Sequence, residues 1–314
     1  ILIVELVAIF TNTSTKFMAA GANIATTLAT FSSFSYLLLY YNQRKSEIAQ
    51  EIKSTINYKY ERVHTILKNV LLVSIPMTIS SILSSVTKNI DAFTVNKILS
   101  TYLPPEIAIE KYGILGGKIE TLIALPLSFN MAFSTALIPT ISAAIAKRNT
   151  ETAKNTSTFS ILISILIGLP CTLGFCIFAQ PILNLLYPNA NSGALLLQIA
   201  SVSIVFSLLI QTTNGALQGF GKVFIPTLSL GIGVVIKLIL NLILLRIPKL
   251  NIYGASIATA CCNIVSFTIA FIALKRIAKL KISFSKFIIK PIVANFIMGI
   301  CSYFVYLTLS RIIV

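Results

Sequence analysis

The stretch Val223–Leu245, with the sequence VFIPTLSLGIGVVIKLILNLILL, decides the fold class because Lys237 is its only charged residue. A helix that crosses the hydrocarbon core of a bilayer needs about 20 apolar residues, and this stretch is long enough. A charge near the bilayer centre costs about 2.5–3.5 kcal/mol on insertion scales, so Lys237 should face a bundle interior or a wet cavity. We therefore expect a polytopic membrane protein whose function is transport or intramembrane chemistry.

The composition of the chain agrees with a membrane protein. Hydrophobic residues make up 56% of it and charged residues 11%, whereas a soluble domain usually has about 25% charged residues. The net charge of +16 would also fit a nucleic-acid partner. The basic residues, however, lie in short segments between apolar runs, which is typical of cytoplasmic loops beside anionic lipids. We expect membrane lipids, and no nucleic acid, around this chain.

Apolar runs predict an all-α chain with one partial and eight full spanning helices. The partial helix is Ile1–Phe10. The full helices are Phe17–Tyr41, Val70–Val95, Ile114–Ala144, Phe159–Phe178, Ala194–Leu217, Val223–Leu245, Gly254–Leu274 and Pro291–Ser310. Because the chain starts without Met and stops directly after an apolar run, we expect it to be truncated at its start and at its end.

The loops that carry most of the Lys and Arg residues alternate with the other loops along the chain. The positive-inside rule assigns these basic segments to the cytoplasm: residues 42–68, 145–157, 218–222 and 275–290. The first segment is long and has charges of both signs, so it should form a partly amphipathic helix that links two membrane bundles. His64 is interpreted as an exposed linker residue, with a pH sensor as the alternative.

Polar residues follow one stripe of the run Val70–Val95. Ser81, Ser84, Lys88 and Asp91 lie on overlapping helical turns, and Lys88 is three residues before Asp91, so these two side chains can pair. One interpretation is a cavity wall that meets an anionic or sugar substrate. The other is an internal ion pair that lowers the cost of membrane insertion.

Three further helices offer polar candidates for a cavity. Lys237 and Asn241 are four residues apart; the lysine is either a point charge for a lipid phosphate or a structural group bonded to carbonyls of a neighbouring helix. Lys118 is a weaker candidate because it can extend to the membrane interface. The last set recurs on one helix face and should meet the cavity or another helix: Gln211, Asn214 and Gln218.

No residue pattern indicates catalysis, a cofactor or a metal. The five cysteines all lie in apolar runs without a CxxC pair, and one histidine cannot form a Ser–His–Asp set at a membrane site. The glycines before Lys222 lack the GxxxxGK[ST] spacing of a phosphate-binding loop, so a tight turn is expected there. We expect no enzyme activity.

Several stretches, taken in order, resemble one known family. They are Ser74–Ser81 (SIPMTISS), Tyr112–Lys118 (YGILGGK), Asn214–Lys222 (NGALQGFGK) and Ile252–Thr259 (IYGASIAT). Their order and spacing resemble the polysaccharide-transporter branch of the multidrug/oligosaccharidyl-lipid/polysaccharide flippase superfamily, and within it the stage V sporulation B group.

This resemblance implies a MATE-like, lipid II flippase-like bundle with two lobes around a central cavity. Residues 1–41 would end the first lobe, 42–68 would be the linker, and 69–314 would form most of the second lobe. The implied activity is flipping of an undecaprenyl-linked saccharide or a lipid II-like molecule for cell wall, spore cortex or surface polysaccharide. Lys88 and Lys237 would bind its pyrophosphate, and a coupling ion or the membrane potential would supply the energy.

Three alternatives stay open at this point. A cation-coupled multidrug exporter of the same fold should have a cavity rich in carboxylates, whereas the helices here have more lysine. A membrane-embedded transferase would need its catalytic groups in a part of the protein outside this chain. The third alternative is a scaffold that organises wall synthesis without transporting anything.

Overall fold

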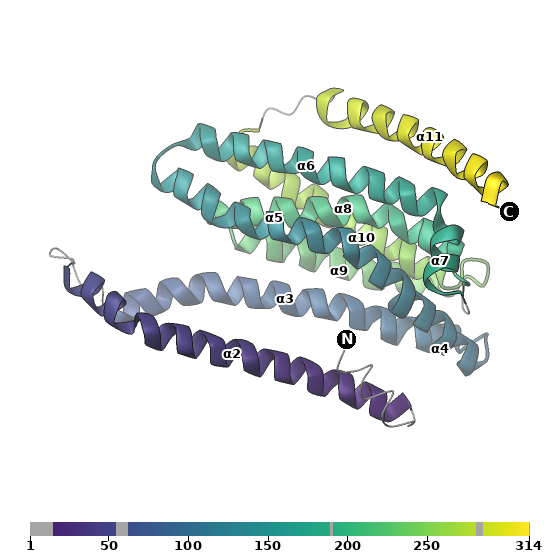
Figure 1. Cartoon of the computed structure of the whole chain (residues 1–314), viewed down its shortest axis with the longest axis horizontal. Helices are drawn as coiled ribbons and strands as arrows, with labels where there is room; N and C mark the ends of the chain where they lie inside the picture. Colours follow the sequence, from purple (N-terminus) through teal and green to yellow (C-terminus); the bar gives the residue numbers. More distant parts are fainter. Residues whose placement is uncertain (1–14, 55–61, 189–190, 281–284, 314) are drawn as a thin grey trace. The chain divides into compact units, whose positions relative to one another are not determined.

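The computed structural model of the chain describes residues 15–54, 62–188, 191–280 and 285–313. It divides into two compact units, Ile1–Ile66 and Leu67–Val314. The expected partial helix Ile1–Phe10 lies outside the described residues. All the secondary structure that is described is helical (Figure 1), which confirms the all-α fold class.

The described part of the first unit is α2, Thr15–Ser54, which is longer than the span expected at Phe17–Tyr41. Residues 42–54 contain no Pro or Gly, so no residue in that stretch ends the helix. Arg44 and Glu47, whose charged groups are 3.7 Å apart, form an i,i+3 ion pair there. The first part of the expected linker is therefore a continuation of the apolar helix, while residues 55–61 lie outside the described part of the chain.

The helices that follow agree closely with the apolar runs. Seven described helical segments are long and apolar enough to cross a membrane, and the eighth expected span lies within α2. The elements are α3 (Val63–Leu99), α4 (Pro105–Gly113), the π-helical turn η1 (Ile114–Ile119), α5 (Glu120–Ala146), α6 (Thr150–Ile177), α7 (Ala179–Leu186), α8 (Ala194–Gly219), α9 (Phe224–Leu244), α10 (Tyr253–Ile277), the π-helical turn η2 (Ser285–Ile289) and α11 (Lys290–Ile313). The first turn of α3 belongs to the first unit.

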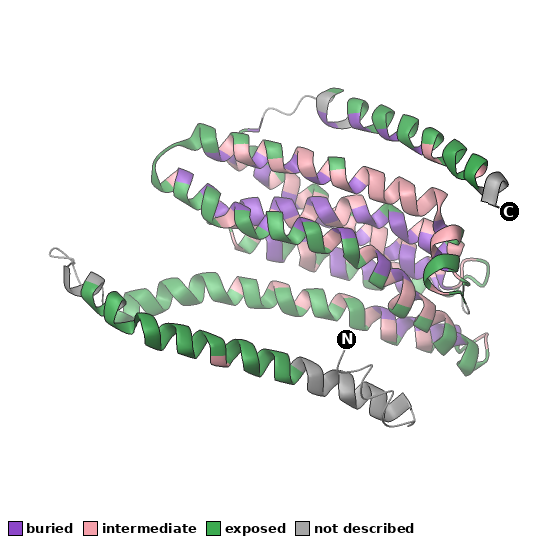
Figure 2. Cartoon of the chain, in the orientation of Figure 1, coloured by how far each residue is buried: buried purple, intermediate pink, exposed green. Residues whose placement is uncertain are grey.

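In the second unit, α8 is the central helix. It packs against α5, α6 and α10, while α9 packs on α10. Buried residues concentrate on α8 and on the faces turned toward it, and the outward faces are exposed and apolar (Figure 2). Apolar residues on both the inner and the outer faces suit a protein in a lipid bilayer, because exposing apolar surface to lipid does not carry the free-energy cost of exposing it to water.

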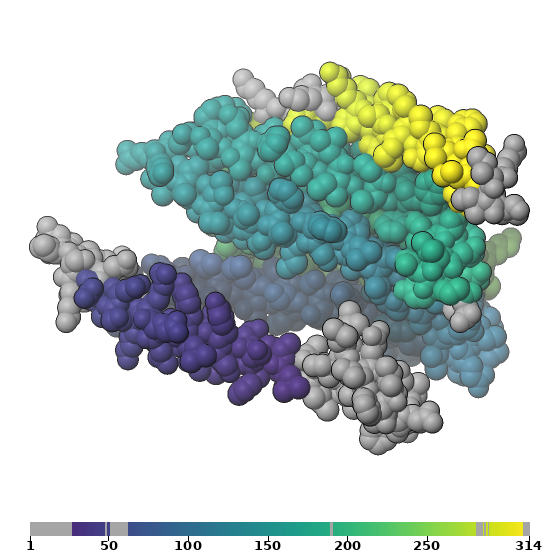
Figure 3. Space-filling model, viewed as in Figure 1, coloured from purple at the N-terminus to yellow at the C-terminus, as the bar shows by residue number. Residues whose placement is uncertain are grey.

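The last helix, α11, lies along α6, as the yellow surface beside the teal one shows (Figure 3). The two helices come close at Gly299, where a β-carbon would be only 2.8 Å from the side chain of Leu173. Near the ends of these helices the rings of Phe178 and Tyr306 meet edge to face, with centroids 5.6 Å apart. A small residue and an aromatic pair thus fix α11 on the bundle.

Of the two α8 glycines that face α5, Gly215 lies nearer to the α5 backbone. A β-carbon there would be 2.5 Å from the carbonyl oxygen of Ser134, which is backbone and cannot rotate away. Small residues at such crossings let membrane helices pack closely. The absence of a side chain at Gly215 therefore allows the short distance between α5 and α8.

We expect Gly215→Ala to destabilise the protein by about 1–3 kcal/mol, the usual cost of overpacking, although alanine favours a helix more than glycine does. Thermal unfolding in detergent would measure the loss. Gly174→Ala is the matched control, because it lies within α6 and a β-carbon there has nothing within 4 Å. Equal stability of the two variants would mean that the α5–α8 approach is not as close as described.

Candidate functional site

A line of polar contacts joins α3 to α9, and we call it the polar seam. On α3 the participating residues recur every three or four positions, or at multiples of that spacing, so they share one face. The seam consists of Pro76, Ser80, Thr87, Asp91 and Thr94 on α3 and of Thr227, Lys237 and Asn241 on α9.

The centre of the polar seam is an ion pair between Asp91 and Lys237. Their side chains are 3% and 2% exposed, and the ammonium group also donates to the carbonyl oxygen of Thr87 at 3.1 Å. The second carboxylate oxygen of Asp91 accepts from the amide of Asn241 at 2.9 Å, and that amide also donates to Thr94 at 3.0 Å. Both charges are thus neutralised and hydrogen-bonded, which allows them at membrane depth.

Neutral hydrogen bonds continue the connection toward both ends of the two helices. Thr227 donates to the carbonyl oxygen of Pro76 at 2.8 Å, and its hydroxyl is 2.7 Å from that of Ser80. Just beyond the end of α3, the hydroxyl of Tyr102 donates to the carbonyl oxygen of Leu245 at 2.9 Å. Burial raises the pKa of Tyr102, so its hydroxyl stays protonated and keeps donating.

The structure corrects the expected pairing of Asp91 with Lys88. Lys88 is exposed, and the described ion pairs include none between it and Asp91. The physical reason is burial, because opposite charges attract more strongly in a low dielectric than at an exposed i,i+3 position. Of the two roles considered for Lys237, its contacts match the structural one, although its partners include a carboxylate besides a carbonyl.

The other expected site residues are distributed over several places. Gln211 accepts a hydrogen bond from Asn130 at 3.1 Å, and the amide oxygen of Asn214 is buried without a hydrogen-bond partner among the described residues. Gln218 is half-buried. The ammonium group of Lys118 lies over the ring of Tyr187, 5.7 Å from its centroid. The structure thus brings Asp91, Lys237 and Asn241 together, whereas Gln211 contacts Asn130 and Lys118 contacts Tyr187.

A second buried cluster, which the sequence analysis did not identify, joins α5, α6 and α8. We call it the Asn130 cluster; it consists of Asn130, Ser134, Ser164, Gln211 and Thr212. The amide of Asn130 donates to the carbonyl oxygen of Leu208 at 3.0 Å and accepts from Ser164 at 2.9 Å. A signal was present in the sequence, since Asn130 and Ser134 are four residues apart on one face of a largely apolar run.

Spanning helices held together by a buried ion pair and by buried hydrogen bonds define a multi-pass membrane protein with a polar interior. More specifically, the chain belongs to the MatE family, whose sequence profile matches residues 76–243. That match includes every residue of the polar seam and of the Asn130 cluster. The expected flippase superfamily is thereby confirmed.

Several proteins of Bacillus subtilis (strain 168) are similar to the chain. The uncharacterized membrane protein YabM is 32% identical over 193 residues, which are 62% of this chain and 36% of YabM. The lipid II flippase MurJ is 28% identical over 264 residues, 81% of this chain and 47% of MurJ. Stage V sporulation protein B is 22% identical over 246 residues, 77% of this chain and 46% of that protein. The chain thus spans less than half the length of these relatives.

A solved structure with the same fold is a multidrug resistance MATE family transporter of the MOP superfamily in an outward-facing conformation. It superposes with a TM-score of 0.60 at 18% identity, covering 72% of this chain and 49% of the transporter. This likeness shows the fold. A lipid II flippase and a MATE family transporter are thus among the proteins similar to this chain, in agreement with the expected class of transporter.

Proposed function

We propose that the chain is part of a flippase that moves a lipid-linked saccharide, undecaprenyl-linked or lipid II-like, across the cytoplasmic membrane by alternating access. Its relation to a lipid II flippase supports this cargo, and the observation that carries the proposal is an exposed polar stripe on α3. We define the α3 stripe as Ser81, Ser84, Ser85 and Lys88.

The α3 stripe is difficult to reconcile with contact to lipid. Lys88 is exposed and lies well inside α3, a helix long and apolar enough to span the membrane. A lysine at such a depth is expected to face a water-filled cavity or a polar partner. An ammonium group beside hydroxyls suits a pyrophosphate that carries sugars, because the lysine binds the charge and the hydroxyls bond the sugar oxygens.

The sequence suggested that Lys88 and Lys237 both bind the pyrophosphate of the cargo. In our proposal the two lysines have different roles. Asp91 already neutralises Lys237, so we assign the phosphate contact to Lys88 and assign Lys237 to holding α3 against α9. The multidrug-exporter alternative needs a free carboxylate for cationic drugs, and Asp91 is not free. Glu120, which is half-buried on α5, is the carboxylate that such an exporter would use.

The test is flipping of a fluorescent lipid-linked saccharide by the complete protein in proteoliposomes. Lys88→Gln should lower the rate tenfold or more, because a hydrogen bond to a charged group contributes about 1.5–3 kcal/mol and 1.4 kcal/mol is a factor of ten. Lys222→Gln, an exposed lysine in the loop between α8 and α9, is the matched control.

An unchanged rate for Lys88→Gln would contradict the assignment of Lys88. Efflux of a cationic dye that is lost in Glu120→Gln, without flipping of the saccharide, would favour the exporter.

We further propose that an ion or potential gradient drives transport. We also propose that residues 42–68, 145–157, 218–222 and 275–290 lie on the cytoplasmic side. Dissipating the gradient with ionophores in the same vesicles checks the energy source.

A further inference from the structure

A groove opens between α6, α8, α10 and the segment formed by η2 and α11. Its volume is about 320 Å³, within the range of about 300–1,000 Å³ that is usual for small-molecule sites. None of the described residues that line it belongs to α3 or α9, so it is separate from the polar seam. We call it the aromatic groove; its lining includes Ile165, Leu169, Leu209, Phe267, Phe271 and Phe287.

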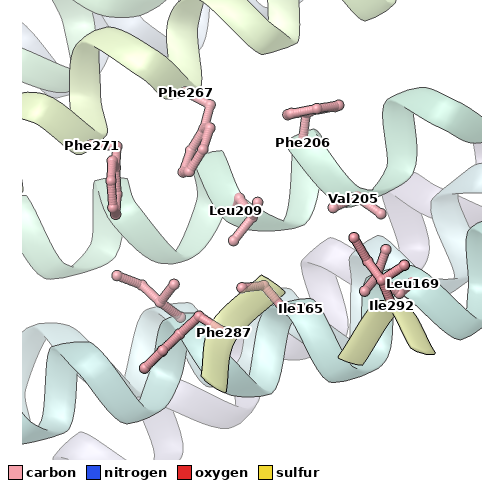
Figure 4. Close-up of a pocket in the computed structure, with 10 residues that line it drawn as sticks. Ile165, Leu169, Val205, Phe206, Leu209, Phe267, Phe271, Phe287 and Ile292 are labelled. Carbon is pink, nitrogen blue, oxygen red and sulfur yellow. The ribbon is translucent and has the colours of Figure 1, made fainter. Parts of the chain in front are cut away.

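Every side chain that lines the aromatic groove is apolar. Phe267 and Phe271 project from α10 into the space between the helices, and Leu209 and Phe287 lie below them (Figure 4). The two rings of α10 are 5.2 Å apart between centroids. The surface offers no hydrogen bond to a sugar or a headgroup, so it is suited to hydrocarbon alone.

A second hollow adjoins the groove and shares Phe271 with it. It is lined by three exposed cations at the end of α10, Lys275, Arg276 and Lys279, which we call the basic mouth. No described residue that lines either hollow is an Asp or a Glu. Phe271 and Lys275 are four residues apart, so they lie on one helix face about 6 Å apart along the axis.

This geometry matches the depth profile of a membrane leaflet. The basic mouth is at the last turn of a spanning helix, where the phosphates of a bilayer lie, and the aromatic groove lies one to two turns deeper, among the acyl chains. A ligand that fits both hollows has a negative phosphate at one end and a hydrocarbon chain at the other. The groove offers no polar side chain to a saccharide, and the mouth offers only cationic ones.

We propose that the aromatic groove and the basic mouth together bind one anionic phospholipid of the surrounding leaflet. An acyl chain fills the groove, and the phosphate lies between Lys275, Arg276 and Lys279. This is a resident lipid site, distinct from the cargo site on α3, and it does not depend on which cargo the complete protein moves.

The chain allows a direct test because it contains no tryptophan. Phe271→Trp in the complete protein places a fluorophore where the two hollows meet, and the signal of the unchanged protein is subtracted as background. Phosphatidylglycerol with brominated acyl chains should quench this tryptophan at a mole fraction about tenfold lower than brominated phosphatidylcholine does. Phe129→Trp, at an exposed position on α5, should show no headgroup preference.

Neutralising the basic mouth with Lys275→Gln, Arg276→Gln and Lys279→Gln should abolish the preference for phosphatidylglycerol. Lys147→Gln, Arg148→Gln and Lys222→Gln remove the same charge from other loops and should preserve it. Equal quenching by both lipids, or a preference that survives neutralisation, would overturn the proposal. Absence of quenching would also overturn it, because it would mean that protein covers the groove. So would relief of the quenching by inorganic phosphate. The same holds if polyprenyl phosphate relieves the quenching at a lower concentration than unbrominated phosphatidylglycerol does.

Discussion

Lys237→Met should lower the free energy of unfolding by about 3–5 kcal/mol, the usual cost of breaking a buried ion pair by removing one partner. The variant leaves the Asp91 carboxylate, which is 3% exposed, with only the amide of Asn241 as a described side-chain partner. It also removes the donor to the carbonyl oxygen of Thr87. Thermal unfolding of the complete protein in detergent, together with its yield from membranes, measures the effect.

The controls for this prediction separate the ion pair from the loss of a lysine in general. Lys88→Met changes an exposed lysine of α3 and should alter stability by no more than about 0.5 kcal/mol. Adding Asp91→Asn to Lys237→Met removes the stranded charge and should recover most of the loss. If Lys237→Met were as mild as Lys88→Met, Lys237 would not be the buried partner of Asp91, and its assignment to phosphate would regain support.

The spanning helices could be predicted from the sequence because each is a long apolar run bounded by polar residues. The run Val223–Leu245, for example, becomes α9, Phe224–Leu244. The π-helical turn η1 between α4 and α5 was not predicted, since hydropathy does not distinguish a π-helical turn from an α-helical one. Likewise α7 is only eight residues long, too short for a membrane pattern.

The sequence identified the central residues of the polar seam, but it did not identify which residue pairs with Asp91. Lysine, aspartate and asparagine inside apolar runs are expensive at membrane depth, so the sequence alone identifies Lys237, Asp91 and Asn241 as special. Local spacing, however, offers only partners one turn away, and therefore suggested Lys88 for Asp91. The true partner is 146 residues distant, and only the packing of α9 beside α3 brings it within reach.

The pairing changes how the chain is understood as a transporter. A lysine that is already neutralised cannot attract a cargo charge without first leaving its carboxylate, whereas the exposed Lys88, one turn before Asp91 on α3, can. In the proposed flippase, the polar seam therefore supports α3, and the α3 stripe is the face offered to cargo. Loss of stability in Lys237→Met and loss of flipping in Lys88→Gln should accordingly separate into different variants.

Asn130→Ala should destabilise the protein by about 2–3 kcal/mol, because a hydrogen bond between membrane helices averages about 0.6 kcal/mol and Asn130 makes several of them. Asn130 is fully buried and bonds to Leu208 and Gln211 of α8 and to Ser164 of α6. Its removal leaves these polar groups with fewer partners in a dry interior and loosens three helices at once. Thermal unfolding in detergent again gives the loss.

Ser128→Ala is the matched control for Asn130→Ala, because Ser128 is exposed on the same helix and donates only to the carbonyl oxygen of Ala124, one turn earlier. It should change stability by less than about 0.5 kcal/mol. The hydroxyls of Ser164 and Thr212 are 2.5 Å apart and would keep each other as partners, so the loss should stay below that of Lys237→Met. A loss for Asn130→Ala as small as that of Ser128→Ala would show that the cluster does not hold α5, α6 and α8 together.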